Sequence, residues 1–197
     1  MKLPKEFFER QDTAAIAREL LGKLIVVPDE MGNRVSGMIV ETEAYLGEAD
    51  RAAHSYGGRR TRRTEVMYGP GGHVYIFLVY GLYHQLNFVT GPPGTPHAIL
   101  IRAVEPTEGI EAIRGRRGEM PDRNLTSGPG KLCSALAIDK RFNGASLSGS
   151  DIWLENYQTV ASADVAVRPR VGIDYAGSDA ELPLRFLLRD NRFVSKP

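Results

Sequence analysis

The chain of 197 residues has the length of one domain, and its 42% hydrophobic and 25% charged residues are ordinary for a globular protein. No apolar run is long enough to span a membrane, the N-terminal residues lack the apolar segment of a signal peptide, and a single cysteine, Cys133, cannot form an internal disulfide. The net charge of +1 is not by itself a signature of nucleic-acid binding, because dedicated binding domains are usually more basic.

The first part of the chain predicts one short helix followed by two strands. Residues 12–22 (DTAAIARELLG) have the apolar spacing of an amphipathic helix, with Asp12 or Thr13 as its N-cap. Residues 23–27 predict a buried strand, and residues 34–47 predict a longer one.

An arginine-rich loop comes next. Of the basic residues, 19 are arginines and 6 are lysines, and arginine is the better bidentate partner for phosphate. The segment from Arg51 to Thr64 (RAAHSYGGRRTRRT) holds five of these arginines and no acidic residue. Such a run is most often a solvated face, but its glycines also suit a flexible loop that contacts phosphates. Both alternatives stay open at this point.

Residues 74–89 predict a β-hairpin with an unusual tip. The two strands, 74–80 and 82–89, are rich in β-branched and aromatic residues. The turn reads Tyr80-Gly81-Leu82-Tyr83, whereas hairpin turns are usually polar. Either another layer of the chain covers this tip, or the tip is kept apolar for a partner.

The second half of the chain adds strands and two helices. We expect a strand at 97–106, a helix at 107–118 with Thr107 as its N-cap, a helix within 126–139, and strands within 151–155 and 182–195. In the second helix, Leu132, Ala135 and Leu136 are expected to face inward, with Cys133 packed as a small hydrophobic residue. Because strands come first and no regular βαβ alternation occurs, we predict an α+β fold: a single mixed domain over residues 1–197, with a curved, mostly antiparallel sheet flanked by helices and a protruding β-hairpin.

Carboxylates interrupt the apolar strand GMIVETEAYLG. The strand period of two places Glu41, Glu43 and Tyr45 on one face. A surface-facing alternation accounts for Glu41, but Glu43 beside an aromatic residue favours a partly buried carboxylate, which needs a cation or donors. Arg102, in the apolar strand AILIRAV, is the candidate cation. The pair could be structural or catalytic.

Other motifs narrow the chemistry. Asn87 lies between apolar residues, so its side chain is satisfied either by the backbone or by a ligand edge. The histidines and the cysteine lack metal-ligand spacing, and neither a metal nor a cofactor is expected. The segment SGPGKL is no complete P-loop, because Leu132 follows Lys131, but the start of its helix could bind a lone phosphate.

Four blocks in order, VETEAYLGEADRAAHSYGG, VYGLY followed by LN, LIRAVEP and TSGPGKLCSALAI, resemble the alkyladenine (3-methyladenine) DNA glycosylase family. The resemblance extends over essentially the whole chain. It implies a single-domain mixed α/β fold and an enzyme of base excision repair. Such an enzyme extrudes damaged purines from duplex DNA and hydrolyses the N-glycosidic bond.

The resemblance also implies roles for individual residues. Glu43 matches the carboxylate that activates the attacking water, and Arg102 matches the arginine beside that water. Four residues match the base pocket: Tyr45, His54, Phe77 and Asn87. Phe77 stands where a family member has tyrosine, and Asn87 matches an asparagine that helps to discriminate bases. Tyr80 matches the hairpin-tip residue that enters the duplex, and the other candidate DNA contacts are Tyr83, Arg59, Arg60, Arg62, Arg63 and Lys131.

These roles explain the apolar tip as a wedge that fills the space left by the extruded base. We expect 3-methyladenine and 7-methylguanine as substrates, with hypoxanthine and ethenoadenine as further candidates. Since the pocket positions include no lysine for a Schiff base, we expect an abasic product without strand cleavage.

Two other classes of protein were weighed. A damage-binding module without turnover is disfavoured by the pairing of Glu43 with Arg102, and a nucleoside hydrolase has no use for an exposed apolar hairpin beside arginines. The expected partner is double-stranded DNA, with no membrane association and a monomeric state. The expected location is the cytoplasm, at the nucleoid, for a bacterial source, or the nucleus for a eukaryotic one.

Overall fold

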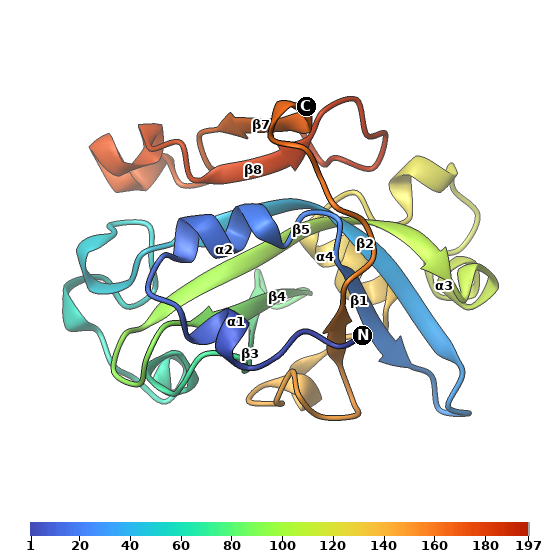
Figure 1. Cartoon of the computed structure of the whole chain (residues 1–197), viewed down its shortest axis with the longest axis horizontal. Coiled ribbons are helices and arrows are strands. Elements are labelled where there is room, and N and C mark those ends of the chain that lie inside the picture. Colours follow the sequence, from blue (N-terminus) through green and yellow to red (C-terminus); the bar gives the residue numbers. More distant parts are fainter. Residues whose placement is uncertain (197) are drawn as a thin grey trace.

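We describe a computed structural model of the chain, which defines residues 1–196. Within this range one antiparallel sheet of eight strands has the order β3-β4-β5-β2-β1-β6, and β8 pairs with both β2 and β7. The strands are β1 (Leu24–Pro28), β2 (Arg34–Tyr45), β3 (Val74–Val79), β4 (Tyr83–Thr90), β5 (His97–Glu108), β6 (Trp153–Glu155), β7 (Val165–Arg168) and β8 (Arg185–Leu188) (Figure 1). The predicted α+β fold with a mostly antiparallel sheet is confirmed.

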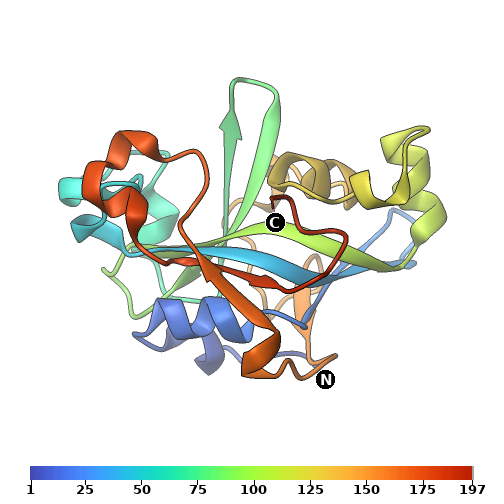
Figure 2. The ribbon, with the colours of Figure 1, turned by 90° about the horizontal axis from the view of Figure 1, so that it is seen from above.

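Four short α-helices cover the sheet: α1 (Glu6–Glu9), α2 (Thr13–Glu19), α3 (Ile110–Arg117) and α4 (Pro129–Ala135). Figure 2 shows α1 and α2 on one side of the sheet and α3 and α4 on the other. The Asp12 side chain accepts a hydrogen bond from the Ala15 amide at 2.9 Å, which confirms the predicted cap of α2. No helix in residues 1–196 has the length and apolar character needed to cross a membrane.

The predicted start of the 107–118 helix is wrong. Thr107 belongs to β5, where its hydroxyl lies 2.7 Å from the Ser36 hydroxyl on β2. This cross-strand contact keeps Thr107 extended, and Gly109, with φ at 68°, makes the turn that starts α3. The elements α1 and β7 were not predicted.

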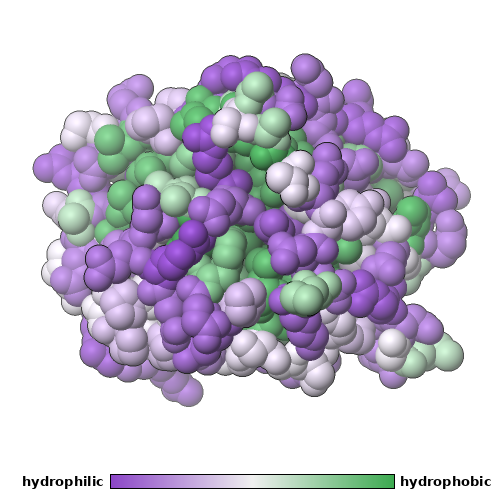
Figure 3. Space-filling view, in the orientation of Figure 1, coloured by the Kyte–Doolittle hydropathy of each residue, from purple (hydrophilic) through white to green (hydrophobic). Residues whose placement is uncertain are grey.

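The core lies between the sheet and its helices. The residues of α4 expected to face inward, Leu132, Ala135 and Leu136, are buried, and so is Cys133, as predicted. Burial raises the pKa of the Cys133 thiol to about 12, so this group is an inert packing element. The face of the molecule that carries α2 is mainly hydrophilic, and apolar residues are visible on it chiefly between the polar ones (Figure 3).

A β-bulge lies where β2 and β5 pair. Glu41 is opposite Ala103 and Thr42 is opposite Ile101, so Arg102 is an extra residue on β5. Bulges redirect side chains, and this one aims Arg102 at the two carboxylates of β2. Along the same stretch the other edge of β2 pairs with β8, so the two carboxylates lie on a strand that has a neighbour on each side.

The β3–β4 hairpin projects from the body of the molecule (Figure 2). Tyr80 (φ 53°) and Gly81 (φ 70°) both have the positive φ of a type I′ turn, and the Leu82 amide donates to the Val79 carbonyl at 3.0 Å. Tyr80 is 90% exposed and Leu82 is 72% exposed. The alternative in which the chain covers this tip is therefore wrong.

Candidate active site

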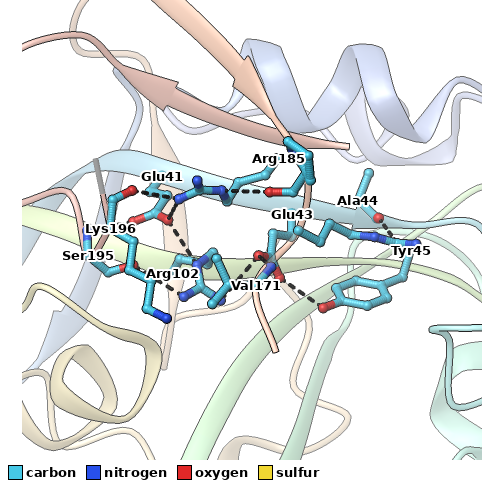
Figure 4. Close-up of polar contacts among 11 residues, drawn as sticks. Glu41, Glu43, Ala44, Tyr45, Arg102, Val171, Arg185, Ser195 and Lys196 are labelled. Atoms are coloured by element: carbon cyan, nitrogen blue, oxygen red, sulfur yellow. Dashed lines mark hydrogen bonds and ion pairs between the residues drawn. The ribbon is translucent and has the colours of Figure 1, made fainter. Parts of the chain in front are cut away.

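Glu43 lies near the C-terminal end of β2, opposite Leu100 of β5 and Arg185 of β8, and is completely buried. Its Oε2 accepts a hydrogen bond from the Tyr45 hydroxyl at 2.8 Å. Its Oε1 accepts one from the Val171 backbone amide at 2.7 Å and lies 3.2 Å from Nη1 of Arg102 (Figure 4). The carboxylate is thus held from three sides.

The surroundings of Glu43 act on its charge in opposite directions. Burial raises the pKa of the Glu43 carboxyl above its ordinary value, while the Arg102 charge, the Val171 amide and the Tyr45 hydroxyl oppose that rise. Since burial outweighs them, Arg102 alone does not set the ionisation of Glu43. A carboxylate with a raised pKa is better matched to take a proton near neutral pH.

The surface-facing interpretation of Glu41 is wrong, because its side chain has no exposed surface. Its Oε1 accepts hydrogen bonds from Arg102 Nε at 2.9 Å and from Arg185 at 3.0 Å, and its Oε2 accepts one from the Ser195 amide at 2.7 Å (Figure 4). The strand period could not reveal this, because the partners of Glu41, the Arg185 side chain and the Ser195 amide, come from segments far from β2 in the sequence.

A cleft of about 350 Å³ opens above Arg102, within the range of small-ligand sites. Its walls include every pocket residue expected from the sequence: Tyr45, His54, Phe77 and Asn87, with Tyr80 at the hairpin. Three further residues, Tyr75, Tyr175 and Val171, also line the cleft, and no sequence pattern pointed to them. Glu43 lies behind this wall, beside Tyr45, Arg102 and Val171.

One wall of the cleft is a cluster of rings. The rings of His54 and Phe77 pack edge to face with their centroids 4.5 Å apart, and the ring centroids of Tyr75 and Phe77 are 5.6 Å apart. Nδ1 of His54 is 2.9 Å from the Tyr75 hydroxyl, and the Arg63 guanidinium lies 3.2 Å from Nε2. Burial together with the charges of Arg63 and Arg59 lowers the pKa of His54 to about 4, so the ring is neutral at pH 7.

Tyr45 forms a different wall. The guanidinium of Arg170 lies 4.7 Å from its ring centroid and also donates to the Ala44 carbonyl at 2.9 Å. Arg170 is in turn held by Asp50, with Nη2 and Oδ1 at 2.8 Å. This pair fixes Tyr45 from behind, and sequence reasoning missed it because its two members lie far apart in the chain.

The backbone satisfies the Asn87 side-chain nitrogen, which is one of the two alternatives that its sequence context left open. Its amide nitrogen donates to the Tyr75 and Gln85 carbonyls, each at 3.2 Å, and its side chain also lines the cleft. The amide oxygen accepts no hydrogen bond from residues 1–196, so it is available to a ligand edge.

The arginine loop divides into three parts. Arg60 forms an ion pair with Glu65 at 2.6 Å, and its guanidinium lies 4.7 Å from the centroid of the Tyr68 ring. Arg63 lies 3.2 Å from Nε2 of His54 and 5.1 Å from the centroid of the Phe77 ring, so it packs against the aromatic wall of the cleft. Arg59 and Arg62 are exposed, and neither has a carboxylate partner within the described part of the chain.

A second groove of about 790 Å³ lies between the hairpin and α4. Leu82, Tyr83 and Lys131 line it together, so the structure brings the remaining candidate DNA contacts to the hairpin. Gly130 permits the close approach: a Cβ atom there would lie 3.0 Å from Cβ of Tyr83. Among residues 1–196 no cluster of His, Cys, Asp and Glu could hold a metal ion.

A buried carboxylate beneath an aromatic cleft, with an apolar hairpin exposed at its edge, suits a hydrolase that works on a base taken out of a nucleic-acid duplex. A family model described as Methylpurine-DNA glycosylase (MPG) matches residues 6–192. The chain belongs to this family and is accordingly a DNA-repair hydrolase that acts on N-glycosyl bonds.

Curated bacterial relatives agree. The chain is 47% identical over 207 residues to a protein of Bacillus cereus (strain G9842), with all of both chains covered. It is 48% identical over 202 residues to one of Desulfitobacterium hafniense (strain Y51), with 98% of each chain covered. Both relatives carry the name "Putative 3-methyladenine DNA glycosylase".

Proposed function

We propose that this enzyme extrudes alkylated purines such as 3-methyladenine and 7-methylguanine from duplex DNA and hydrolyses their N-glycosidic bond with a water activated by Glu43. The observation that carries the proposal is the placement of Glu43, buried beside the cleft and held by Tyr45, Val171 and Arg102. A carboxylate needs such support to remain available as a base in a dry site.

The reaction follows from the bond that is broken. When the bond between C1′ and the purine nitrogen breaks, its electron pair leaves with the base and positive charge develops on the sugar. Ionised Glu43 stabilises that charge and accepts a proton from water, whose oxygen forms the new bond to C1′. Arg102 lines the cleft and its Nη1 lies 3.2 Å from Oε1 of Glu43, so this nitrogen is the donor that we assign to hold the water beside the carboxylate.

The cleft supplies the base pocket. Tyr45 and Phe77 provide aromatic faces for stacking, and the positive charge of alkylated purines strengthens that stacking. The amide oxygen of Asn87 offers a polar contact at the base edge, where hypoxanthine and ethenoadenine could also be recognised, while His54 contributes its ring to the wall of the pocket. The residues that line the cleft include no lysine, which supports a monofunctional enzyme that leaves an abasic site.

The hairpin tip supplies the wedge. An aromatic side chain stacked on a base contributes about 1–3 kcal/mol, comparable to the few kcal/mol needed to extrude a nucleotide. Tyr80, fully presented to solvent, can enter the gap, while Tyr83, Lys131, Arg59 and Arg62 lie where flanking phosphates can be contacted. One monomer carries all these residues, so we propose that a monomer acts on the duplex.

The test is the variant Glu43→Gln, which keeps the shape and removes the proton acceptor. Duplexes with one lesion each are incubated in single turnover and treated with alkali to cleave abasic sites. We expect excision to fall by about 10²–10⁴-fold while lesion binding survives. Glu119→Gln, at an exposed position on another part of the surface, is the matched control. Excision by Glu43→Gln within a few-fold of wild type would contradict the role of Glu43.

A further inference from the structure

We propose that Glu41 and the segment Asn191–Lys196, through Ser195, are positioning elements that hold the Arg102 guanidinium in place beside Glu43. The inference rests on the function proposed above, because it assumes that Glu43 and Arg102 carry the reaction. Neither Glu41 nor Ser195 lines the cleft, so both act through Arg102 rather than on the DNA.

Each nitrogen of Arg102 has its own neighbour. Nε donates to Glu41 at 2.9 Å, Nη2 donates to the Ser195 hydroxyl at 3.2 Å, and Nη1 is left 3.2 Å from Oε1 of Glu43. A planar guanidinium held at two of its nitrogens cannot rotate the third away. The contact with Glu43 is therefore set by the other two contacts.

Glu41 and Ser195 also hold each other. The Ser195 amide donates to Oε2 of Glu41 at 2.7 Å, which closes a ring of contacts through Arg102 (Figure 4). Arg185 joins the ring, because its Nη1 donates both to Glu41 at 3.0 Å and to the Lys196 carbonyl at 2.7 Å.

The segment is anchored well enough to serve as a support. Phe193 and Val194 are buried in the core, and the side-chain nitrogen of Asn191 donates to the Glu105 carboxylate of β5 at 2.7 Å. Ser195 follows directly on these anchors, so its position is fixed relative to β5, the strand that carries Arg102. Residues that orient a catalytic group in this way can change rates strongly without touching substrate, as a misplacement of about 1 Å can cost on the order of 10²-fold.

The ionisation of Glu43 offers a readout that a purely structural role would not move. The charged or titratable groups around Glu43 are Tyr45 and Glu41 on β2, Arg102 on β5, Arg185 as its neighbour on β8, Arg170 in the segment beside Val171, and Tyr175. Among them Arg102 is the leading influence that lowers the pKa of Glu43 against burial. If Arg102 moves away, that pKa rises further and the ionised form is lost at a higher pH.

The variant Ser195→Ala isolates this effect. It removes the acceptor of Nη2 and leaves the backbone amide and all the surrounding charges in place. The probe is a duplex with 7-methylguanine, whose positive charge lets the base leave without protonation, so the acidic limb of the rate profile reports Glu43. We expect single-turnover excision to fall about three- to tenfold and the acidic limb to shift to higher pH.

Two further variants and one control sharpen the test. Ser195→Thr restores a hydroxyl and should recover the rate and the limb. A chain that stops after Val194 loses the contacts to Glu41, Arg102 and Arg185 and should be slower than Ser195→Ala. Ser150→Ala makes the same chemical change at an exposed serine and should behave as wild type.

The outcomes separate this inference from the proposed function. If Glu43→Gln is inactive while Ser195→Ala and the shortened chain keep the wild-type rate and acidic limb, the positioning role is wrong and the proposed function stands. If Ser195→Ala is slower with an unmoved limb and a lower free energy of unfolding, the contact is only structural and the inference also fails. If Glu43→Gln remains active, the proposed function itself fails.

Discussion

The buried charges behind the cleft (Glu41, Glu43 and Arg102, called the floor below) and the tip of the hairpin both hold side chains outside their ordinary environment, but in opposite ways. At the floor, Glu41, Glu43 and Arg102 are charged groups removed from water, and each has partners at close range. At the tip, Tyr80 and Leu82 are apolar groups left in water with nothing covering them. The first arrangement gives fixed geometry, and the second leaves a surface that can be completed only by a partner.

This contrast assigns different costs to the two regions. Charges in the interior are tolerated because each of them is paired. Removing one partner leaves the others buried and unpaired, so at the floor function is coupled to folding. The tip contributes little to folding and can be optimised for contact with DNA alone. Truncation at the tip should therefore separate stability from activity, whereas removal of the Arg102 cation at the floor should cost both.

The largest expected effect is at the floor. Arg102→Ala leaves two buried carboxylates short of a cation, so we expect the free energy of unfolding to fall by about 3–5 kcal/mol. Excision should be lost as well, since Glu43 loses its charged neighbour. Denaturant unfolding and single-turnover excision measure the two losses, and a variant as stable as wild type would show that the pairing is dispensable for folding.

The tip should behave in the opposite way. Tyr80→Ala should leave the free energy of unfolding within about 0.5 kcal/mol of wild type, as surface changes usually do. Its cost should appear in excision, because nothing fills the gap and the lesion returns to the stack. The loss should be smaller for a lesion in a mismatch, where less stacking is broken on extrusion. Equal impairment on paired and mispaired lesions, with a large loss of stability, would remove the contrast.

The pH dependence of excision sharpens the description of the floor. In the proposed mechanism ionised Glu43 is the base, so the rate should fall as the pH drops through the pKa of Glu43. Because burial raises that pKa, the fall should begin closer to neutrality than for an ordinary glutamate. A rate profile on a 7-methylguanine duplex measures the limb, which should disappear from the residual activity of Glu43→Gln. A limb at or below the usual glutamate range would contradict the effect of burial.

The smallest effect is expected in the arginine loop. Arg59→Ala and Arg62→Ala should each weaken binding to any duplex sequence and flatten the slope of log affinity against log salt by about one unit. Arg60→Ala is the internal comparison, because Arg60 is already engaged with Glu65 and should change the slope less. Salt titrations of duplex binding measure all three, and equal slopes throughout would return the loop to a solvated face.

The sequence predicted the fold better than it predicted the support of the site. Periodicity identified the long strands and the cap of α2, because these signals are local. Thr107 was misplaced because a hydroxyl contact across strands prevailed over its local preference for a helix start. The site residues Glu43 and Arg102 stood out as charges in apolar strands.

What surrounds Glu43 and Arg102 was less accessible from sequence. Val171 acts through its backbone amide and leaves no side-chain signature. Glu41, Ser195 and Arg185 meet only because β2, β8 and a later segment converge, and strand periodicity carries no information about that convergence. The exposure of Tyr80 likewise depends on how far the hairpin projects, which no local pattern states.

The backbone of Tyr80 has a consequence for attempts to make this enzyme more heat-resistant. A tyrosine held at positive φ costs about 1–3 kcal/mol, whereas glycine or asparagine adopts this conformation readily. A laboratory selection for thermal survival alone would therefore favour Tyr80→Gly or Tyr80→Asn, and would also penalise the exposed apolar tip. Such a selection would yield a more heat-resistant protein without the proposed wedge, so any screen for stability here has to be paired with an assay for excision.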